Sequence, residues 1–169
     1  MTVPAAGLVT RRATGRRCLA ALFAPVLAAA GPALQLQGEG GAVLAQLPMP
    51  GGAEICLHWA HSVTGGAVAD CFENRAGRLT LTRSFLQDYA AGLGEVAGRG
   101  QVVAAQGGGY WITGIDEAMP ANSLTLRAGS ARVGHRLAVT TLQGQGQELQ
   151  LSEYVARGAR VRLYLNLTP

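Results

Sequence analysis

The densest group of side chains able to do chemistry lies between residues 58 and 73, and it comprises His58, His61, Ser62, Asp70 and Glu73. A histidine, a serine and an acid together suggest a nucleophilic triad. Neighbouring residues on an extended strand point to opposite faces, however, so His61 cannot serve there as the base for Ser62. The chain also has no Gly-x-Ser-x-Gly nucleophile elbow. We therefore expect no serine hydrolase and assign no catalytic residue.

The same side chains are candidates for a metal site. His58 and His61 are three residues apart, a spacing that converges on a helix but diverges on a strand. On a strand, one histidine would need Asp70 or Glu73 from across a hairpin. Zinc sites usually have three or four converging ligands, and no second cluster supplies them. Two interpretations therefore remain. Either these four residues bind a metal, or one histidine is a hydrogen-bonded structural residue and the other is solvated.

Composition limits the class of protein. Of 169 residues, 49% are hydrophobic and 24 are glycine, which is typical of one globular domain with many tight turns. Four of the 14 basic residues precede position 18, and the rest balance the 10 acids, so the body is neutral and nucleic acid is not expected. The absence of lysine excludes a Schiff base and a P-loop lysine. The glycine-rich stretches 92–98 and 107–109 lack the strand–helix–strand context of a dinucleotide site, so we predict no cofactor.

From Leu34 onward, apolar residues alternate with polar or small ones in short runs separated by turn residues. A period of two indicates strands that are buried on one face. The stretch 85–94 is ambiguous between a helical turn and a loop. The pattern predicts an all-β fold, a single antiparallel sandwich or barrel domain over residues 34–169. The predicted strands are 43–47, 55–59, 68–72, 79–81, 102–104, 110–112, 124–127, 137–141, 149–151 and 161–167.

Residues 1–33 are predicted to be a signal peptide or a membrane anchor. An apolar run, 18–30, is followed by small residues and preceded by Arg11, Arg12, Arg16 and Arg17. The run is short for a bilayer span and has Pro25 in its middle, although extending it to Leu36 leaves an uncleaved hydrophobic helix as an alternative. Either interpretation predicts an exported body, periplasmic or anchored to the inner membrane and facing the periplasm.

Export puts Cys56 and Cys71 in a compartment that permits disulfides. A two-residue turn at Gly65–Gly66 would place Ala60 opposite Cys71 and separate the cysteines by about 13 Å, beyond the roughly 7 Å between Cα atoms that a disulfide allows. Direct opposition would need the turn at 63–64. Because glycine in a primed hairpin turn is the stronger local signal, the sequence favours free, half-buried thiols over a disulfide.

We expect a structural role for the His61–Ser62 pair. The hydroxyls of Ser62 and Thr64 flank the turn, where they can bond nearby backbone groups. The side chains of His61 and Asp70 are candidates for a cross-strand pair in the predicted hairpin. If so, His61→Gln preserves folding and most of the function.

Several of these residues also carry a family resemblance. The most specific elements are His61-Ser62-Val63 and then Val68 with Asp70; they are followed by Gly77-x-Leu79-x-Leu81, Tyr89-Ala90-Ala91-Gly92-Leu93, Gly109-Tyr110-Trp111-Ile112, Leu126-Arg127 and Arg136-Leu137. In these positions the chain resembles a family of bacterial domains of unknown function, DUF1850, over residues 43–165. It departs from the family at Ala67, where proline is common, and at Ala90, where the family has a glycine. The candidate functional residues are His61, Ser62, Val63, Asp70, Tyr89, Gly92 and Leu93.

The resemblance implies a context more than a chemistry. Such proteins are commonly encoded beside, or joined to, TAXI-type TRAP transporters for small organic anions, and they tend to carry a hydrophobic N-terminal segment. We therefore expect a non-enzymatic accessory module that contacts the TRAP permease or its solute-binding protein, with membrane contact through an uncleaved N-terminus. The alternatives are a metal-dependent enzyme or metal-binding module on His58, His61, Asp70 and Glu73, and a small-ligand binder with a pocket around Tyr89 and Trp111.

Overall fold

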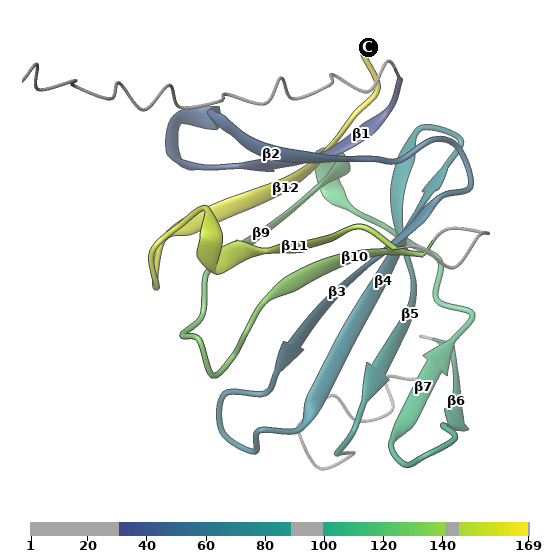
Figure 1. Ribbon diagram of the computed structural model, residues 1–169. Helices are drawn as coiled ribbons and strands as arrows, with labels where there is room; N and C mark the ends of the chain where they lie inside the picture. Colours follow the sequence, from purple (N-terminus) through teal and green to yellow (C-terminus); the bar gives the residue numbers. More distant parts are fainter. Residues whose placement is uncertain (1–30, 89–99, 141–145, 169) are drawn as a thin grey trace, which may run out of the picture.

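The computed structural model describes residues 31–88, 100–140 and 146–168, and it confirms an all-β fold with antiparallel sheets (Figure 1). Among these residues no helix has the length and apolarity to cross a membrane. The 3-10 turns are η1 (Glu39–Gly41), η2 (Pro120–Asn122) and η3 (Leu151–Glu153). The strands are β1 (Ala33–Gln37), β2 (Val43–Pro48), β3 (Glu54–Ala60), β4 (Ala67–Arg75), β5 (Arg78–Leu86), β6 (Gln101–Ala104), β7 (Tyr110–Thr113), β8 (Glu117–Ala118), β9 (Ser123–Arg127), β10 (Arg136–Thr140), β11 (Glu148–Gln150) and β12 (Arg160–Asn166).

The described strands form two packed sheets. The small sheet has the order β2-β1-β12-β9, and the large sheet has the order β11-β10-β3-β4-β5-β7-β6, with β8 paired to β5. Figure 1 shows the small sheet at the top, with β3, β4 and β5 continuing below it. One apolar cluster joins the sheets, and it includes Leu34, Leu36, Leu163 and Leu165 from the small sheet and Ile55, Leu57, Phe72 and Leu79 from the large one. The architecture is a β-sandwich.

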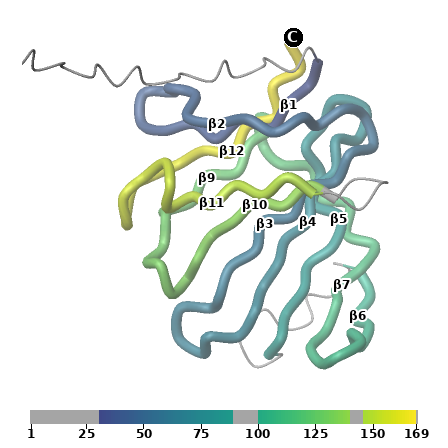
Figure 2. Tube along the Cα trace, viewed as in Figure 1, coloured from purple at the N-terminus to yellow at the C-terminus, as the bar shows by residue number. Residues whose placement is uncertain are grey.

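The predicted alternation is clearest in β12. Val161, Leu163 and Leu165 are buried, whereas Arg160 and Arg162 lie on the other face. Figure 2 shows that β12 runs beside β1, although the two strands lie at opposite ends of the described chain. The hydrophobic effect selects this register, because a slip of one residue would move the buried leucines to the outer face.

Strand β1 begins at Ala33, within the segment that the sequence assigns to the leader or anchor. Leu34 and Leu36 are 2% and 1% exposed and lie in the core between the sheets. An apolar helix extended to Leu36 is therefore not what these residues form. Alternation with Gln35 and Gln37, which face outward, makes a strand that is buried on one face.

A buried asparagine anchors the β4–β5 hairpin. Its two-residue turn, Ala76–Gly77, has φ of 49° and 81°, as a primed turn requires. Asn74 is 2% exposed; its Oδ1 accepts from Gly77 N at 2.9 Å and its Nδ2 donates to Met49 O at 2.7 Å. The side chain therefore ties this turn to the segment that follows β2.

The β3–β4 hairpin differs from the prediction. The strands pair from Glu54 with Glu73 to Ala60 with Ala67, so Cys56 lies directly opposite Cys71 and the two form a disulfide. The expectation of free thiols is wrong, and so is the two-residue glycine turn.

The physical reason is a wider connection over residues 61–66. His61 N donates to Gly66 O, and His61 O accepts from Gly65 N, both at 2.8 Å. Thr64 Oγ1 accepts from Gly66 N at 3.2 Å. These bonds stabilise a turn in which only Gly65 needs its positive φ, 75°, and the wider turn allows the cysteines to meet.

Candidate functional site

The outer face of the large sheet carries a polar cluster, which we call the disulfide face and define as Glu54, Cys56, Cys71, Arg83 and Trp111. Directly paired residues of antiparallel strands share a face, and Cys71 pairs with both Cys56 and Arg83. The opposite face of these strands meets the small sheet. The disulfide face is therefore turned away from the core.

Arg83 holds the cluster together. Its Nε and Nη2 donate to the two carboxylate oxygens of Glu54 at 3.1 and 2.5 Å. Its Cζ lies 4.6 Å from the centroid of the Trp111 ring, a cation–π contact. The Phe85 ring packs against Trp111 with the centroids 5.3 Å apart. Glu54 and the Trp111 ring both bind the Arg83 guanidinium within the protein. Arg83 therefore rigidifies this face.

Within the described residues, Glu54, Cys56 and Cys71 are the one set of three potential metal ligands whose atoms lie within 4.8 Å of one another. A cysteine binds metal as its thiolate, and bonded sulfurs have no thiolate. Glu54 is also engaged by Arg83. With the disulfide formed, the chemistry of this set does not fit a metal centre.

His58 lies on the same face, two residues after Cys56, and its direct partner on β10 is Arg136. Burial lowers the pKa of His58, and Arg136 lowers it further, against the opposing effect of Glu148. Arg136 and Glu148 form an ion pair at 2.6 Å. His58 is therefore neutral at pH 7.

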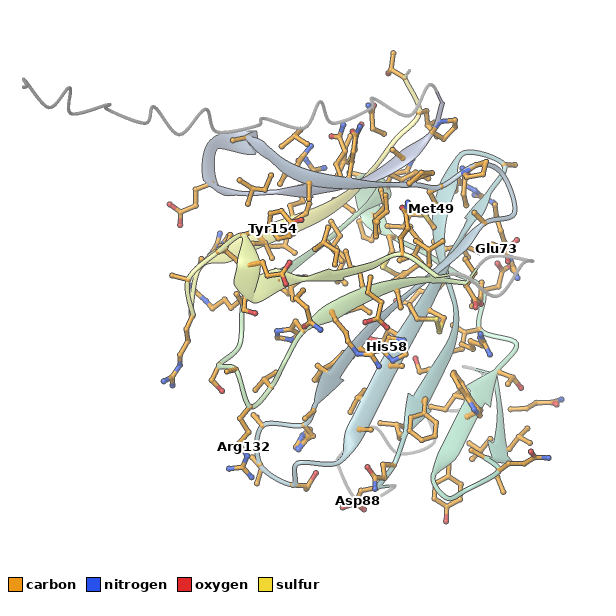
Figure 3. All side chains as sticks on the ribbon, viewed as in Figure 1. Met49, His58, Glu73, Asp88, Arg132 and Tyr154 are labelled. Carbon is orange, nitrogen blue, oxygen red and sulfur yellow. A yellow bond between two sulfur atoms is a disulfide. The ribbon has the colours of Figure 1, made fainter. Side chains whose placement is uncertain are left out.

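The four predicted metal ligands are not brought together. His58 and Glu73 share a face, but Ala69, not Glu73, is opposite His58. The two residues are offset by four positions along the strands, about 13 Å, and Figure 3 shows them at separate places on the sheet. Glu73 instead pairs with Arg75 at 3.0 Å.

Asp70 and His61 lie apart from His58 and Glu73. Asp70 is adjacent to Cys71 and so points to the other face, where its Oδ1 accepts from Ser84 Oγ at 2.6 Å. Leu57 is its cross-strand partner. The predicted pairing of His61 with Asp70 is wrong, because His61 lies beyond the end of β3, in the turn.

Hydrogen bonds of His61 and Thr64 stabilise the His61 turn. His61 Nδ1 accepts from Thr64 N at 3.3 Å. The predicted hydroxyl-to-backbone bond is confirmed for Thr64, whose Oγ1 accepts from Gly66 N. Ser62 and Val63 are exposed at the tip of the turn, with Val63 79% exposed. The turn places a histidine and an apolar side chain at the surface.

Three candidate residues, Tyr89, Gly92 and Leu93, lie outside the described residues. So do most of the ambiguous stretch 85–94 and the Tyr89 half of the predicted small-ligand pocket. The Trp111 half is described, and there the indole ring contacts Arg83 and Phe85. Trp111 is a member of the disulfide face.

Sequence reasoning missed a groove between the two sheets. A hollow of about 570 Å³ lies between β2 and β11, and it is lined by Val43, Leu44, Ala45, Gln46, Leu47, Gln147, Glu148, Leu149 and Tyr154. β2 and β11 are the terminal strands of their sheets, so in the described part of the chain each has an edge without a paired strand. Val43 is 51% and Tyr154 42% exposed. No local pattern marks this groove, because its walls come from distant segments.

We call this feature the edge groove. Figure 3 shows Tyr154 on the β11 side of it, below β2. An unpaired strand edge presents backbone N–H and C=O groups that can pair with another extended chain. The exposed apolar side chains beside these edges can cover the side chains of such a chain. The edge groove is therefore suited to binding an extended peptide segment.

Comparison with known families gives one match. The model of the family "Domain of unknown function (DUF1850)" matches residues 55–149, more than half of the chain. The match spans most of the chain from β3 to β11 and so includes the disulfide, the His61 turn and residues 147–149 of one wall of the edge groove. No curated protein and no solved structure matches.

Proposed function

The chain belongs to the DUF1850 family, and from this premise we propose that it is an exported, non-enzymatic module that assists a TAXI-type TRAP uptake system through protein–protein contact. The family resemblance suggests the transporter. The arginine-flanked apolar run near the N-terminus supports export to the periplasm, as a free or membrane-anchored protein.

The observation that carries the proposal is the edge groove. Its two walls are strand edges, and one of them, β2, is six residues long, enough to pair with a segment of about 20 Å. The occupant we propose is an extended segment of the TRAP permease or its solute-binding protein, with apolar side chains at alternate positions. Backbone pairing would supply affinity, and contacts with Val43 and Tyr154 would supply specificity.

Site-specific photocrosslinking tests this contact. A photoreactive amino acid replaces Val43 in the full chain, which is produced together with the permease and binding protein. Val103 on β6 is a matched control position, because it is 49% exposed against 51% for Val43 and lies at the far edge of the large sheet. We expect a crosslinked product from position 43 that contains the permease or the binding protein, and none from position 103.

Three results would contradict the proposal, two of them through the yield of the crosslink and one through its identity. One is the absence of a product from position 43 when the protein is present at normal levels. The other is an equal yield of the same product from position 103, which would indicate collision rather than docking. A product that contains only unrelated proteins also contradicts the assignment to the transporter.

A further inference from the structure

Three arginines gather on the outer face of the small sheet. Arg160 and Arg162 alternate on β12 with Val161 and Leu163, whose side chains are buried in the core. Arg127 on β9 is the direct cross-strand partner of Arg160. All three arginines therefore project from the same face of β9 and β12.

This arrangement places like charges opposite each other, which disfavours the folded state unless an anion compensates. A second pair of like charges shows such compensation within the protein, because Arg75 lies opposite Arg78. Arg75 forms ion pairs with Glu73 at 3.0 Å and with Asp116 at 2.9 Å.

The three arginines of the small sheet lack that compensation within the described residues, where no ion pair links them to a carboxylate. Arg127 Nη1 donates to Gly158 O at 3.2 Å, and Arg162 Nη2 donates to Ala121 O at 3.5 Å. Arg162 also stacks on Tyr164, with Cζ 4.7 Å from the ring centroid. These contacts orient the guanidinium groups of Arg127 and Arg162 but do not neutralise them.

A hollow of about 470 Å³ lies among these side chains, a size typical of small-molecule sites. Its lining combines the 3-10 turn η1 with the ends of β9 and β12, and it consists of Gly38, Glu39, Gly40, Thr125, Arg127, Arg160, Val161 and Arg162. Three arginines face one glutamate there, so the lining carries a net positive charge.

We propose that this hollow, the arginine groove, binds an oxyanion, a phosphate or carboxylate group, between Arg127 and Arg160. Guanidinium groups bind both kinds of oxyanion through paired N–H donors. Arg162 adds a third cation, and the Thr125 hydroxyl adds a neutral donor from the same lining. The source of the group is either a free small anion or the headgroup of a phospholipid.

Equilibrium titration of the full chain tests the groove, in a buffer of low ionic strength because salt screens exposed charges. The probes are inorganic phosphate, succinate and a short-chain phosphatidylglycerol kept below its micelle concentration. The first two represent free anions and the third a lipid headgroup. We expect saturable binding of at least one probe, weakened about tenfold or more by Arg160→Gln and by Arg127→Gln, since each substitution removes charge-assisted hydrogen bonds to the anion.

Arg78→Gln is the control, since it removes the same charge from an exposed position on another hairpin. The groove is supported if this control leaves binding intact while Arg160→Gln and Arg127→Gln each weaken it about tenfold or more. The probe that binds most tightly then identifies the source of the oxyanion. No saturable binding up to about 20 mM, well beyond the millimolar range of weak sites, would overturn the proposal. Equal weakening by all three variants would also overturn it, because that result indicates a response to net charge alone.

Discussion

Cys56 and Cys71 lie directly opposite each other on β3 and β4, with their Cα atoms 4.0 Å apart and their sulfurs bonded. The disulfide closes the hairpin that carries the His61 turn, and it lies beside the Glu54–Arg83 ion pair. The disulfide therefore belongs both to the hairpin that ends in the His61 turn and to the polar outer face of the large sheet.

The first prediction concerns this disulfide. The residues are 15 apart in sequence, and a disulfide closing a loop of that size stabilises a protein by about 3 kcal/mol, chiefly by restricting the unfolded chain. We expect Cys56→Ala/Cys71→Ala to lower the free energy of unfolding by about that amount in urea denaturation.

A thiol titration checks the premise of that prediction. In a Cys18→Ser background, denatured and unreduced protein should show no free thiol. Titration of both remaining cysteines would show that the disulfide does not form.

The second prediction concerns Asn74. Removing its side chain leaves Met49 O and Gly77 N without their partner in a buried site, which costs about 1–3 kcal/mol. We expect Asn74→Ala to lower the free energy of unfolding by about 2 kcal/mol in urea denaturation. Asn166→Ala is the control, because among the described residues the side chain of Asn166 bonds only to nearby Thr168, and its removal should cost less than about 0.5 kcal/mol. Equal effects of the two substitutions would contradict the anchoring role of Asn74.

The third prediction concerns pH. Burial lowers the pKa of both His58 and His135 below 6.5, so each is neutral in the folded protein near pH 7. The unfolded chain binds protons more tightly, and the free energy of unfolding should therefore be highest above about pH 6.5 and fall as the pH decreases toward 5.

His135 has a specific reason to follow this pattern. Its Nδ1 accepts from Gly129 N at 3.0 Å, and a protonated ring has no acceptor at that position. The double variant His58→Gln/His135→Asn should flatten the dependence of the unfolding free energy on pH between 7 and 5. An unchanged slope in this variant would refute the assignment.

The fourth prediction concerns His61. In the described part of the chain the His61 side chain bonds only within an exposed turn, so His61→Gln should change the free energy of unfolding by less than about 1 kcal/mol. The crosslink from position 43 should also persist, since the turn is separate from the edge groove. Loss of the crosslink in a well-folded His61→Gln protein would assign the turn a direct role in binding.

The alternation of apolar residues predicted most of the strands, because one buried face imposes a period of two on a strand of a sandwich; β1 and β8 are not among the predicted strands. Val161, Leu163 and Leu165 show this. The Ala76–Gly77 turn is different, because Gly77 suits its φ of 81° whereas Ala76 has a φ of 49°, in the left-handed region that alanine rarely adopts. The DUF1850 resemblance likewise rested on short local motifs and is confirmed.

Only the tertiary structure decided how distant residues meet. The register of β3 and β4 depended on hydrogen bonds from His61 and Thr64 inside a six-residue turn, which outweighed the local preference of Gly65–Gly66. The edge groove and the arginine groove each combine segments from different parts of the chain. A sequence pattern reports what each strand buries, but the neighbour of each strand is selected by packing over the whole core.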